Sequence, residues 1–377
     1  MTDVVVVSLE PWDGVWRRNQ HLVSELLLTD PFCRVLFAEP APDPIHAALA
    51  GHTPRRGRGL RRGPRLEGVS EEQLWLYEPT KWLPRRLDHR VDARLARSIA
   101  NAATRARFDS PVLWINDPAG ASLLEATDLP ALYDITDDWT AADRPPTEHA
   151  RLVRNERLLL QGSAEVVVCS PQLRTTKGAT RAVTMIPNAV DVDAYAVEHP
   201  RPHDLPSGRV AVYVGTVHTD RMDVDLCVEA ARAIDGVGHL VLVGPALLAR
   251  SDLQRLRDAH VTLTGAKNFA DVPAYLRHAD VLVVPHLVNA FTDSLDPIKV
   301  YEYRAARRPV VSTPVAGFRD GRSPAITLAV GVAFTQAVHR ALATPPAPDV
   351  VPAELPTWTD RATQMRTVLA RAAQATN

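Results

Sequence analysis

Short runs of β-branched and other apolar residues recur along the chain between helix-like stretches, and they constrain the fold more than any other feature. Five runs lie between residues 4 and 170, and five more lie between 210 and 313. Their hydrophobicity is continuous rather than alternating, which is typical of strands buried on both faces of a parallel sheet. Helical spacers between such strands imply right-handed crossovers. The pattern therefore predicts an α/β fold with two doubly wound domains.

The interruption between the two series of strands predicts where the domains divide. It falls in the Pro-rich segment 185–208, and 377 residues suit two domains of about 150 to 200 residues each. We predict a first domain over 1–188, a second over 189–355, and a closing helix over 356–377 that packs back on the first domain. Open parallel sheets bind ligands at the carboxyl ends of their strands, so we expect the site between the domains.

Charge and cysteine content argue against several classes of protein. A net charge of −1 predicts no general affinity for nucleic acid. The three cysteines, Cys33, Cys169 and Cys227, have neither metal-ligand spacing nor an even count, which fits a reducing cytoplasm. The N-terminal apolar run is too short for a signal peptide, and no later run is long enough to span a membrane. We expect a soluble, cytoplasmic protein, and contact with a membrane face and the oligomeric state are left open.

The segment 53–65 holds six arginines among glycines and prolines, which predicts a loop. Two interpretations remain for it. It is either a solvated variable insertion or a basic surface that recognises an anionic acceptor or a membrane.

The stretch SLDPIKVYEY, residues 294–303, combines a helix start with a cation at the unfavourable end of the helix. Asp296 followed by Pro297 predicts a capping residue and the first helical position. Lys299 then opposes the helix dipole unless both bind one anion. Glu302 lies one turn further along the same face. We interpret Lys299 as part of a diphosphate site and Glu302 as the group that binds a ribose diol. The alternative is an ordinary surface pair.

A second segment, VAVYVGTVHTDR at 210–221, predicts the same kind of ligand. Gly215 at the strand end permits close approach of a ligand to the backbone, and Arg221 can bind phosphate oxygens through its bidentate fork. There is no G-x-G-x-x-G after either first strand and no P-loop motif. Their absence argues against a dinucleotide-dependent dehydrogenase and a P-loop NTPase.

The first half offers candidate contacts for a second substrate. In SLEPWDGVWRRNQHL, residues 8–22, two tryptophans can stack on a sugar, and charged neighbours can orient it. The motif YDITDDW adds carboxylates beyond a strand end. The candidate acceptor residues are Trp12, Asp13, Trp16, Arg17, Arg18, Asp137 and Asp138.

Purely structural roles for some of these acceptor-side residues are left open. Arg18 and Gln20 could tie the helix to neighbouring loops, and Asp137 or Asp138 could cap the following helix. His21 and His286 are the histidines best placed by strand ends, although a satisfied structural histidine is the more common case.

Taken in order, these motifs resemble the C-terminal half of the retaining, nucleotide-sugar-dependent glycosyltransferases with the GT-B fold. That large family contains sucrose synthase and many bacterial polysaccharide and natural-product transferases. The motifs are MIPNAVDVDAY, YVGTVHTDR, LVLVGP, VTLTGAKNFADVPAYLRHADVLVVP and SLDPIKVYEYRAARRPVVSTPVAG. PWDGVWRRNQHL and YDITDDW are similar to a subgroup linked to cell-surface polysaccharides. The resemblance implies two Rossmann-like domains with a cleft between them.

The resemblance also implies roles for individual residues. A glycine-rich loop and two basic residues hold the donor diphosphate in that family, which implies Gly215, Arg221 and Lys299. Lys299 and Arg221 become the candidate catalytic residues because they would stabilise the leaving diphosphate. Glu302 matches the glutamate that binds the ribose. The resemblance implies that the donor base lies against Ala266 and Lys267. The other residues expected around the donor are Thr216, His218, Asp293, Ser294, Leu295 and Asp296.

Two positions depart from the family pattern. Ser294 stands where the family has a glutamate that contacts the transferred sugar, and Thr216 stands where it has a basic residue. The identity of the sugar is therefore left open. The nucleotide base is also left open, so the donor could be UDP-, GDP- or TDP-linked.

The expected function is transfer of a sugar from a nucleotide-sugar donor with retention of configuration, as a hexosyltransferase that needs no metal and no cofactor. The acceptor could be a polysaccharide, a lipid-linked glycan or a natural product. Two alternatives remain: a nucleotide-sugar epimerase or hydrolase on the same fold, and an inactive homologue that acts as a binding partner.

Overall fold

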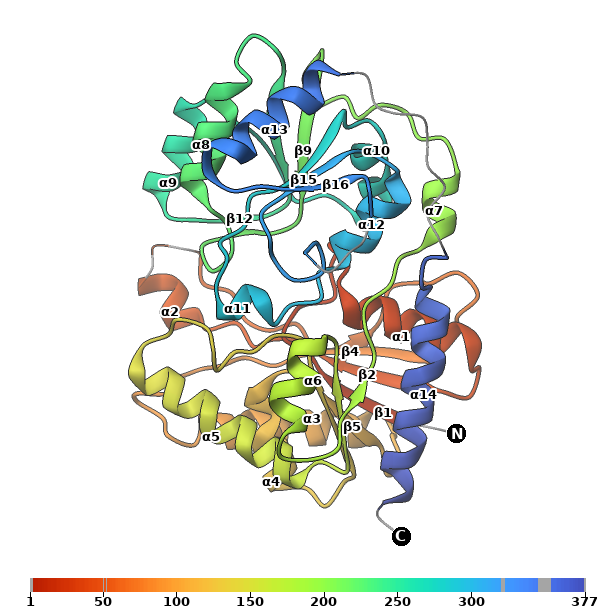
Figure 1. Cartoon of the computed structure of the whole chain (residues 1–377). Helices are drawn as coiled ribbons and strands as arrows, with labels where there is room; N and C mark the ends of the chain where they lie inside the picture. The colour runs from red at the N-terminus through yellow and green to blue at the C-terminus, as the bar shows by residue number, and fades with distance from the viewer. Residues whose placement is uncertain (1–2, 50, 52, 320–322, 345–353, 376–377) are drawn as a thin grey trace.

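The computed structural model describes residues 3–49, 51, 53–319, 323–344 and 354–375. It has two α/β units, drawn one above the other in Figure 1. Each of the predicted ranges 1–188, 189–355 and 356–377 includes some residues outside the described ones, and these bounds stay a prediction.

The first sheet has eight strands in the order β3-β4-β2-β1-β5-β6-β7-β8. Its strands pair in parallel except for β3, which is antiparallel to β4. Val4 and Val6 of β1 pack into the core on one face of the sheet, and Val5 and Val7 pack into the core on the other. The strands are β1 Asp3–Val7, β2 Arg34–Ala38, β3 Gly59–Arg62, β4 Leu74–Glu78, β5 Val112–Ile115, β6 Ala131–Ile135, β7 Glu165–Val168 and β8 Thr184–Met185.

Helices cover both faces of this sheet, as expected for parallel strands joined by crossovers. Helix α1 packs in the core that contains Val4, and α3 packs in the core that contains Val5. The helices are α1 Arg18–Thr29, α2 Pro44–Leu49, α3 Val91–Arg105, the 3₁₀ turn η1 Pro118–Gly120, α4 Ala121–Ala126, α5 Pro146–Gly162 and α6 Pro171–Gly178.

The prediction of a loop over 53–65 is wrong for its centre, because Gly59–Arg62 forms the edge strand β3. Its partner β4, LWLYE, alternates buried and half-buried residues, a pattern typical of a strand near the edge of a sheet. Arginines of this hairpin pair with two fully buried carboxylates. The ion pairs are Arg55–Glu78 at 2.6 Å, Arg58–Glu78 at 2.8 Å, Arg58–Glu39 at 3.1 Å and Arg61–Glu39 at 2.5 Å.

The second sheet has six parallel strands in the order β13-β11-β9-β14-β15-β16. Both faces are again covered, which confirms the predicted α/β class. The strands are β9 Val210–Val214, β11 His239–Val243, β13 Thr262–Gly265, β14 Val281–Val284, β15 Val310–Ser312 and β16 Ile326–Leu328, with a small separate sheet of β10 Val217–His218 and β12 Ala246–Leu247. The helices are α7 Val192–Ala196, α8 Val224–Ala233, α9 Arg250–Asp258, η2 Phe269–Asp271, α10 Val272–Arg277, α11 Ala290–Asp293, α12 Ile298–Ala306 and α13 Gly331–Ala343.

The last helix, α14 Trp358–Gln374, lies along the first unit rather than the second (Figure 1). Its apolar residues, among them Trp358, Met365 and Leu369, are buried in the same core as Val4 and Val6. Thr357 and Asp360 form a capping box at its start, which satisfies free backbone N–H groups. The chain therefore crosses twice between the units, and the crossings touch where Val190 N–H donates to the Pro356 carbonyl at 3.1 Å.

Two further observations concern the compartment and the membrane. Cys33, Cys169 and Cys227 are all buried and unpaired. Among the helices in the described part of the chain, none is long and apolar enough to cross a bilayer.

The burial of α14 predicts that its packing stabilises the first unit. Met365 is completely buried, so Met365→Ala should lower the free energy of unfolding by roughly 2–5 kcal/mol through lost contacts and a cavity. Thr367→Ala, on the exposed side of the same helix, is the matched control and should change it by less than about 0.5 kcal/mol. Urea unfolding followed by circular dichroism measures both. Equal stability of the two variants would contradict the burial of this face.

Candidate active site

Lys299 reaches from the first turn of α12 to the end of strand β9. Its Nζ lies 3.0 Å from the point that a Cβ on Gly215 would occupy, and 5.0 Å from the centroid of the Tyr213 ring. Gly215 has φ of 141°, and a Cβ on Gly244, at the next strand end, would lie 2.2 Å from the Gly215 carbonyl oxygen. Both positions thus need glycine. The ammonium forms no hydrogen bond and no ion pair within the described residues.

Arg221 supplies a second cation from the loop after β10. Its backbone is fixed to the end of β14, because the Arg221 carbonyl accepts the N–H of Leu287 at 2.8 Å. The guanidinium carbon lies 5.7 Å from the centroid of the Phe291 ring, and the buried Nε has no hydrogen-bond partner. Among the described side chains, no carboxylate forms an ion pair with this guanidinium.

Burial and the charges within this group shift the pKa of Lys299 and of Glu302. Burial, followed by the positive charge of Arg221, lowers the pKa of Lys299 to about 8, while Glu302 acts in the opposite direction. Burial raises the pKa of Glu302 to about 7, while Lys299 acts to lower it. Glu302 has no hydrogen-bond partner among the described residues, so the interpretation of a simple paired Lys299 and Glu302 has no support in the contacts. The site holds two cations and one carboxylate, each without a direct partner.

His286 and Tyr213 form the buried floor beneath Lys299. The Tyr213 hydroxyl and His286 Nε2 are 3.1 Å apart, and the His286 N–H donates to the Thr313 hydroxyl at 3.2 Å. Burial, with the nearby charges of Lys299 and Arg221, holds the pKa of His286 well below its ordinary value. A neutral structural histidine fits these contacts.

Thr216 and His218 lie beside the cations but are tied to other groups. The Thr216 carbonyl accepts the Tyr213 hydroxyl at 3.3 Å. His218 Nδ1 accepts the Asp220 N–H at 3.1 Å, and the Asp220 carboxylate pairs with Arg144 of the first unit at 2.9 Å. This ion pair joins the loop after β10 to the first unit.

The loop after β13 carries the residues predicted to lie against a base. Ala266 is exposed, and the Lys267 ammonium pairs with Asp204 at 2.5 Å. Asp204 also accepts the Tyr275 hydroxyl at 2.6 Å. The Lys267 side chain is thus engaged within the protein, and backbone groups are what this loop offers to a ligand.

The predicted cap at Asp296 is wrong. Pro297 is the N-cap of α12 and no side chain caps the helix. The Asp296 carboxylate instead accepts the Asn188 N–H at 2.5 Å and the Tyr301 hydroxyl at 2.9 Å. The free N–H groups of this helix end are therefore not occupied by a side chain, while Asp296 ties the helix start to the crossing segment at Asn188.

The rest of segment 293–296 faces neighbouring protein groups. Asp293 pairs with Arg319 at 3.0 Å, and Leu295 packs with Phe291 against Ala142 of the first unit.

Ser294, where the family pattern has a glutamate, is buried between the two units. Its hydroxyl donates to the Phe291 carbonyl at 2.7 Å and accepts the Asp138 N–H at 3.1 Å, while its carbonyl accepts the Ser170 hydroxyl at 2.6 Å. Both Asp138 and Ser170 belong to the first unit, so Ser294 acts as a polar contact between the units.

The predicted aromatic platform of the first unit is used for packing. Trp12 is buried, with its ring centroid 4.9 Å from that of Phe37. Trp16 stacks on Phe269 of the second unit at 3.8 Å and 20°, and the Phe269 N–H donates to the Gly14 carbonyl at 2.7 Å. Stacking of a sugar on Trp16 at this position would require Phe269 to move.

The arginines of the same segment have different surroundings. Arg17 pairs with Glu10 at 2.8 Å and lies 3.7 Å from the exposed Asp13. Arg18 is buried and pairs with Asp134 at 3.3 Å, and Gln20 Nε2 donates to the Pro11 carbonyl at 3.1 Å. The tying role left open for Arg18 and Gln20 matches these contacts. His21 is half-buried and stacks on Trp358, 4.7 Å between ring centroids, and burial lowers its pKa to about 3.

Asp137 and Asp138 do not cap the following helix, whose N-cap is Pro145. Asp138 accepts from Lys177 at 3.0 Å, whereas Asp137 accepts only the Thr136 hydroxyl at 3.0 Å among the described residues. Burial raises the pKa of Asp137, and the charge of Arg221 opposes this shift. The charge of Arg221, on the second unit, therefore acts on Asp137.

Glu10 is the residue of this site that the sequence reasoning missed. Burial raises its pKa to about 7, and Arg17, Asp137 and Arg221 all act on its charge. It therefore lies among the charged groups of both units. Its place three residues after the first buried strand, in "SLEPW", is the signal that could have singled it out.

Within the described residues, no group of three His, Cys, Asp or Glu side chains is placed to hold a metal ion. Independence from metal stays a prediction.

Comparison with known proteins identifies the class to which this geometry belongs. Residues 208–344 match the family described as glycosyl transferases group 1. Three solved structures superpose over almost the whole chain, with TM-scores of 0.61 to 0.64. The chain has the GT-B fold, and the match to the group 1 glycosyltransferase family covers most of its second unit, in agreement with the resemblance of the sequence motifs.

The individual relatives are distant. Sucrose-phosphate synthase from Thermosynechococcus elongatus is 18% identical with a TM-score of 0.64, over 100% of this chain and 97% of that chain. The catalytic domain of starch synthase IV from Arabidopsis thaliana, bound to ADP and acarbose, is 12% identical with a TM-score of 0.63, over 99% of both chains. TarM from S. aureus, as a point mutant in complex with fondaparinux, alpha-GlcNAc-glycerol and UDP, is 9% identical with a TM-score of 0.61, over 100% of both chains.

A curated relative is the putative teichuronic acid biosynthesis glycosyltransferase TuaH of Bacillus subtilis (strain 168). It is 22% identical over 199 residues, which make up 48% of this chain and 50% of that protein. The match thus spans about half the length of this relative.

The contacts of Ser294 predict how the chain responds to the carboxylate that the family pattern would place there. Ser294→Glu should destabilise the protein by several kcal/mol, because it places a charge with no cationic partner in a buried polar contact. Ser294→Ala should cost about 1–3 kcal/mol by leaving the Asp138 N–H unpaired. Thermal unfolding measures both, with exposed Ser251→Ala as the control. A Ser294→Glu variant as stable as the unmodified chain would show that this position faces an open site.

Proposed function

We propose that this protein transfers a sugar from a nucleoside diphosphate donor to an acceptor hydroxyl or amine, with retention of configuration at the anomeric carbon. The observation that carries the proposal is the pair Lys299 and Arg221, two cations beside the strand end at Gly215 with no carboxylate bound to either among the described residues. Half-buried cations without counter-ions are costly unless a ligand neutralises them. A diphosphate has the matching charge. ADP in the starch synthase complex and UDP in the TarM complex support this choice.

The difficult step in such a transfer is departure of the diphosphate from an oxocarbenium-like sugar. Lys299, Arg221 and the uncapped N–H groups of α12 would stabilise the charge that grows on the leaving oxygen, as preorganised donors do elsewhere. Glu302, one turn along the helix, would accept hydrogen bonds from the ribose. Backbone groups after β13 would lie against the base. In the front-face mechanism that the resemblance implies, the leaving phosphate takes the acceptor proton, so no dedicated base is assigned.

The remaining donor residues keep narrower roles in this proposal. Thr216 and His218 would border the phosphates through the loop that also carries Arg221. Asp293, Ser294, Leu295 and Asp296 would position α12 rather than contact the sugar, because their side chains are bound to protein groups. Glu10 and Asp137 take the place of the aromatic platform as the acceptor-side groups nearest the cations.

Acceptor-side roles and cellular context are also proposals. Arg17, through Glu10, would orient the acceptor, while Trp12, Trp16 and Arg18 would hold the segment that carries both. The donor base and the sugar are unspecified, no cofactor is assigned, and the reaction would take place in the cytoplasm.

The direct test is removal of the ammonium. Lys299→Ala should fold normally and lower turnover about 100-fold or more, because a group that acts on the leaving charge is lost. A coupled assay for released nucleoside diphosphate, run over UDP-, GDP-, TDP- and ADP-sugars with candidate acceptors, measures the change. Arg232→Ala, an exposed arginine of α8, is the control and should keep full activity. Full activity of Lys299→Ala would overturn the proposal, and equal release without any acceptor would favour a hydrolase.

The lowered pKa of Lys299 predicts how donor binding depends on pH. The free site loses its ammonium charge as pH rises through about 8, and a bound diphosphate raises this pKa by favouring the charged form. Affinity for a nucleoside diphosphate should therefore begin to fall near pH 8 and decline by up to about tenfold per unit above it. Isothermal titration calorimetry measures this. Lys299→Arg keeps its charge throughout and should remove the decline. The same decline in both proteins would refute the assignment.

A further inference from the structure

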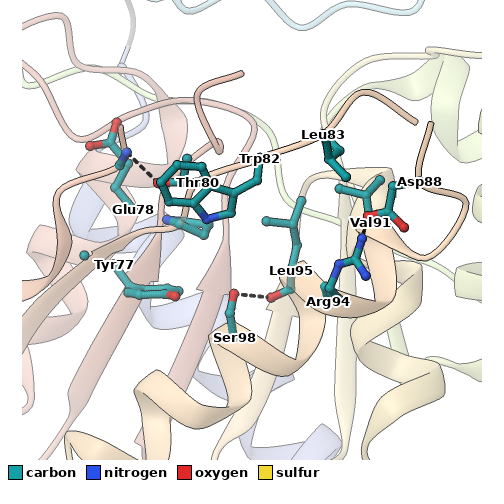
Figure 2. A pocket seen from close by; sticks show the side chains of 13 residues that line it. Tyr77, Glu78, Thr80, Trp82, Leu83, Asp88, Val91, Arg94, Leu95 and Ser98 are labelled. Atoms are coloured by element: carbon teal, nitrogen blue, oxygen red, sulfur yellow. Dashed lines mark hydrogen bonds and ion pairs between the residues drawn. The ribbon is translucent and has the colours of Figure 1, made fainter. Parts of the chain in front are cut away.

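A cavity of about 560 Å³ opens in the first unit, between the end of β4 and the start of α3. Figure 2 shows side chains of both elements around it. The polar side chains that line it are those of Thr80 and Ser98 and three charged groups, Glu78, Asp88 and Arg94. Glu78 pairs with Arg55 and Arg58, and Asp88 pairs with Arg94. The other side chains of the lining are apolar or aromatic. They are Tyr77, Pro79, Trp82, Leu83, Val91 and Leu95. The volume falls in the range of small-molecule sites. We call this cavity the Trp82 pocket.

The mouth of the Trp82 pocket exposes large apolar side chains. Trp82 is 56% exposed, Leu83 is 40% exposed and Leu87 is 72% exposed, and all three lie in one short segment between β4 and α3. Single exposed apolar residues are ordinary, but three beside an apolar cavity indicate a binding surface.

Three exposed arginines lie over Trp82 or in the segment 79–90 that carries it. The Arg56 guanidinium lies 4.9 Å from the centroid of the Trp82 ring, and Arg86 and Arg90 are exposed without an ion pair among the described residues. They differ from the neighbouring Arg55 and Arg58, which are bound to Glu78. Free positive charge therefore lies over Trp82 and on the segment that supplies Trp82 and Leu83 to the cavity, which suits a ligand with an apolar body and an anionic group.

A second, smaller cavity of about 60 Å³ continues from the Trp82 pocket toward the proposed transfer site. It shares Pro79 and Leu95 with the pocket and ends at Ser8, directly after β1. The Ser8 hydroxyl accepts the Glu10 N–H at 3.1 Å. The two cavities thus follow the carboxyl ends of β4, β2 and β1 as far as Ser8, two residues before Glu10.

We propose that the Trp82 pocket holds the apolar part of an amphiphilic, anionic acceptor, with its anionic group against the arginines of the mouth. The acceptor's reactive hydroxyl would then reach Glu10 and Asp137. This inference rests on the proposed function, because it assigns the substrate class of the acceptor side. It also gives the arginine-rich segment 53–65 a divided role: Arg55, Arg58 and Arg61 hold the hairpin, and Arg56 faces the ligand.

Binding of a simple amphiphile tests the pocket without any donor. Decyl phosphate, kept below its micelle concentration, should bind in the micromolar to millimolar range by isothermal titration calorimetry, whereas inorganic phosphate should bind at least tenfold more weakly. Ser98→Phe fills the pocket from α3 and should weaken decyl phosphate binding at least tenfold. Thr104→Phe places the same side chain on an exposed turn of the same helix and should leave binding unchanged. Equal affinity of the two variants would overturn the proposal.

Charge reversal separates the two parts of the ligand. The double variant Arg86→Glu, Arg90→Glu should weaken decyl phosphate at least tenfold but change the binding of decyl glucoside less than twofold. Arg157→Glu with Arg174→Glu, exposed on α5 and α6, is the matched control. Co-sedimentation with vesicles of phosphatidylglycerol and phosphatidylcholine distinguishes a lipid surface. If the protein binds vesicles but not decyl phosphate monomers, and Ser98→Phe leaves vesicle binding unchanged, the proposal is overturned in favour of a membrane-docking face.

The outcome is independent of the donor-site tests. Lys299→Ala should bind decyl phosphate as the unmodified protein does. If decyl phosphate does not bind as expected but Lys299→Ala still lowers turnover, only the proposed class of acceptor is overturned. If decyl phosphate binds as expected but Lys299→Ala keeps full turnover, only the transfer proposal is overturned.

Discussion

The approach of the Lys299 ammonium to the backbone of Gly215 is the contact on which the rest of the site depends. It requires a residue without a side chain at the end of β9, and a second glycine at the end of β11 because the two strand ends nearly touch. It also requires α12 to begin where its first turn faces that strand end. Asp296 meets this requirement by binding Asn188 and Tyr301 instead of capping the helix. The helix N-terminus is thereby left open beside the lysine, so both can act on one anion.

The same segment also joins the two units. Ser294 accepts a hydrogen bond from Asp138 and another from Ser170, and Leu295 packs against Ala142. A glutamate at position 294 could not make these contacts without burying its charge. The departure from the family pattern therefore has a structural reason, because Ser294 contributes to the interface between the units. Glu10 and Asp137, on the first unit, lie among the charges that meet Arg221.

Sequence reasoning predicted those parts that depend on local pattern. Continuous apolar runs gave the buried parallel strands, and the spacing in SLDPIKVYEY put Lys299 and Glu302 on one face of α12. Sequence reasoning failed where a side chain can bind either a neighbour in the sequence or a residue that is distant in the sequence. Asp296 was expected to cap its own helix but binds a residue 108 positions away, and Trp16 was expected to be open but stacks on Phe269. The edge strand β3 was hidden because Arg61 and the adjacent Arg58 are balanced by Glu39, which follows β2, and Glu78, at the end of β4.

Two groups of cations in this chain show why charge counts alone do not locate a site. Arg55, Arg58 and Arg61 look like a basic patch in the sequence, yet two fully buried carboxylates neutralise them, so little of their charge is free for a ligand. Lys299 and Arg221 are 78 positions apart in the sequence and attract no notice as a patch, yet neither is paired among the residues that the structure describes. Removing a cation from water is unfavourable whatever its neighbours, and only an internal or an external anion can offset it. At Gly215 the carboxylate of Glu302 acts on Lys299 but forms no ion pair with it among the described residues, while burial and Arg221 lower the pKa of the ammonium. The proposed function assigns the missing negative charge to a ligand.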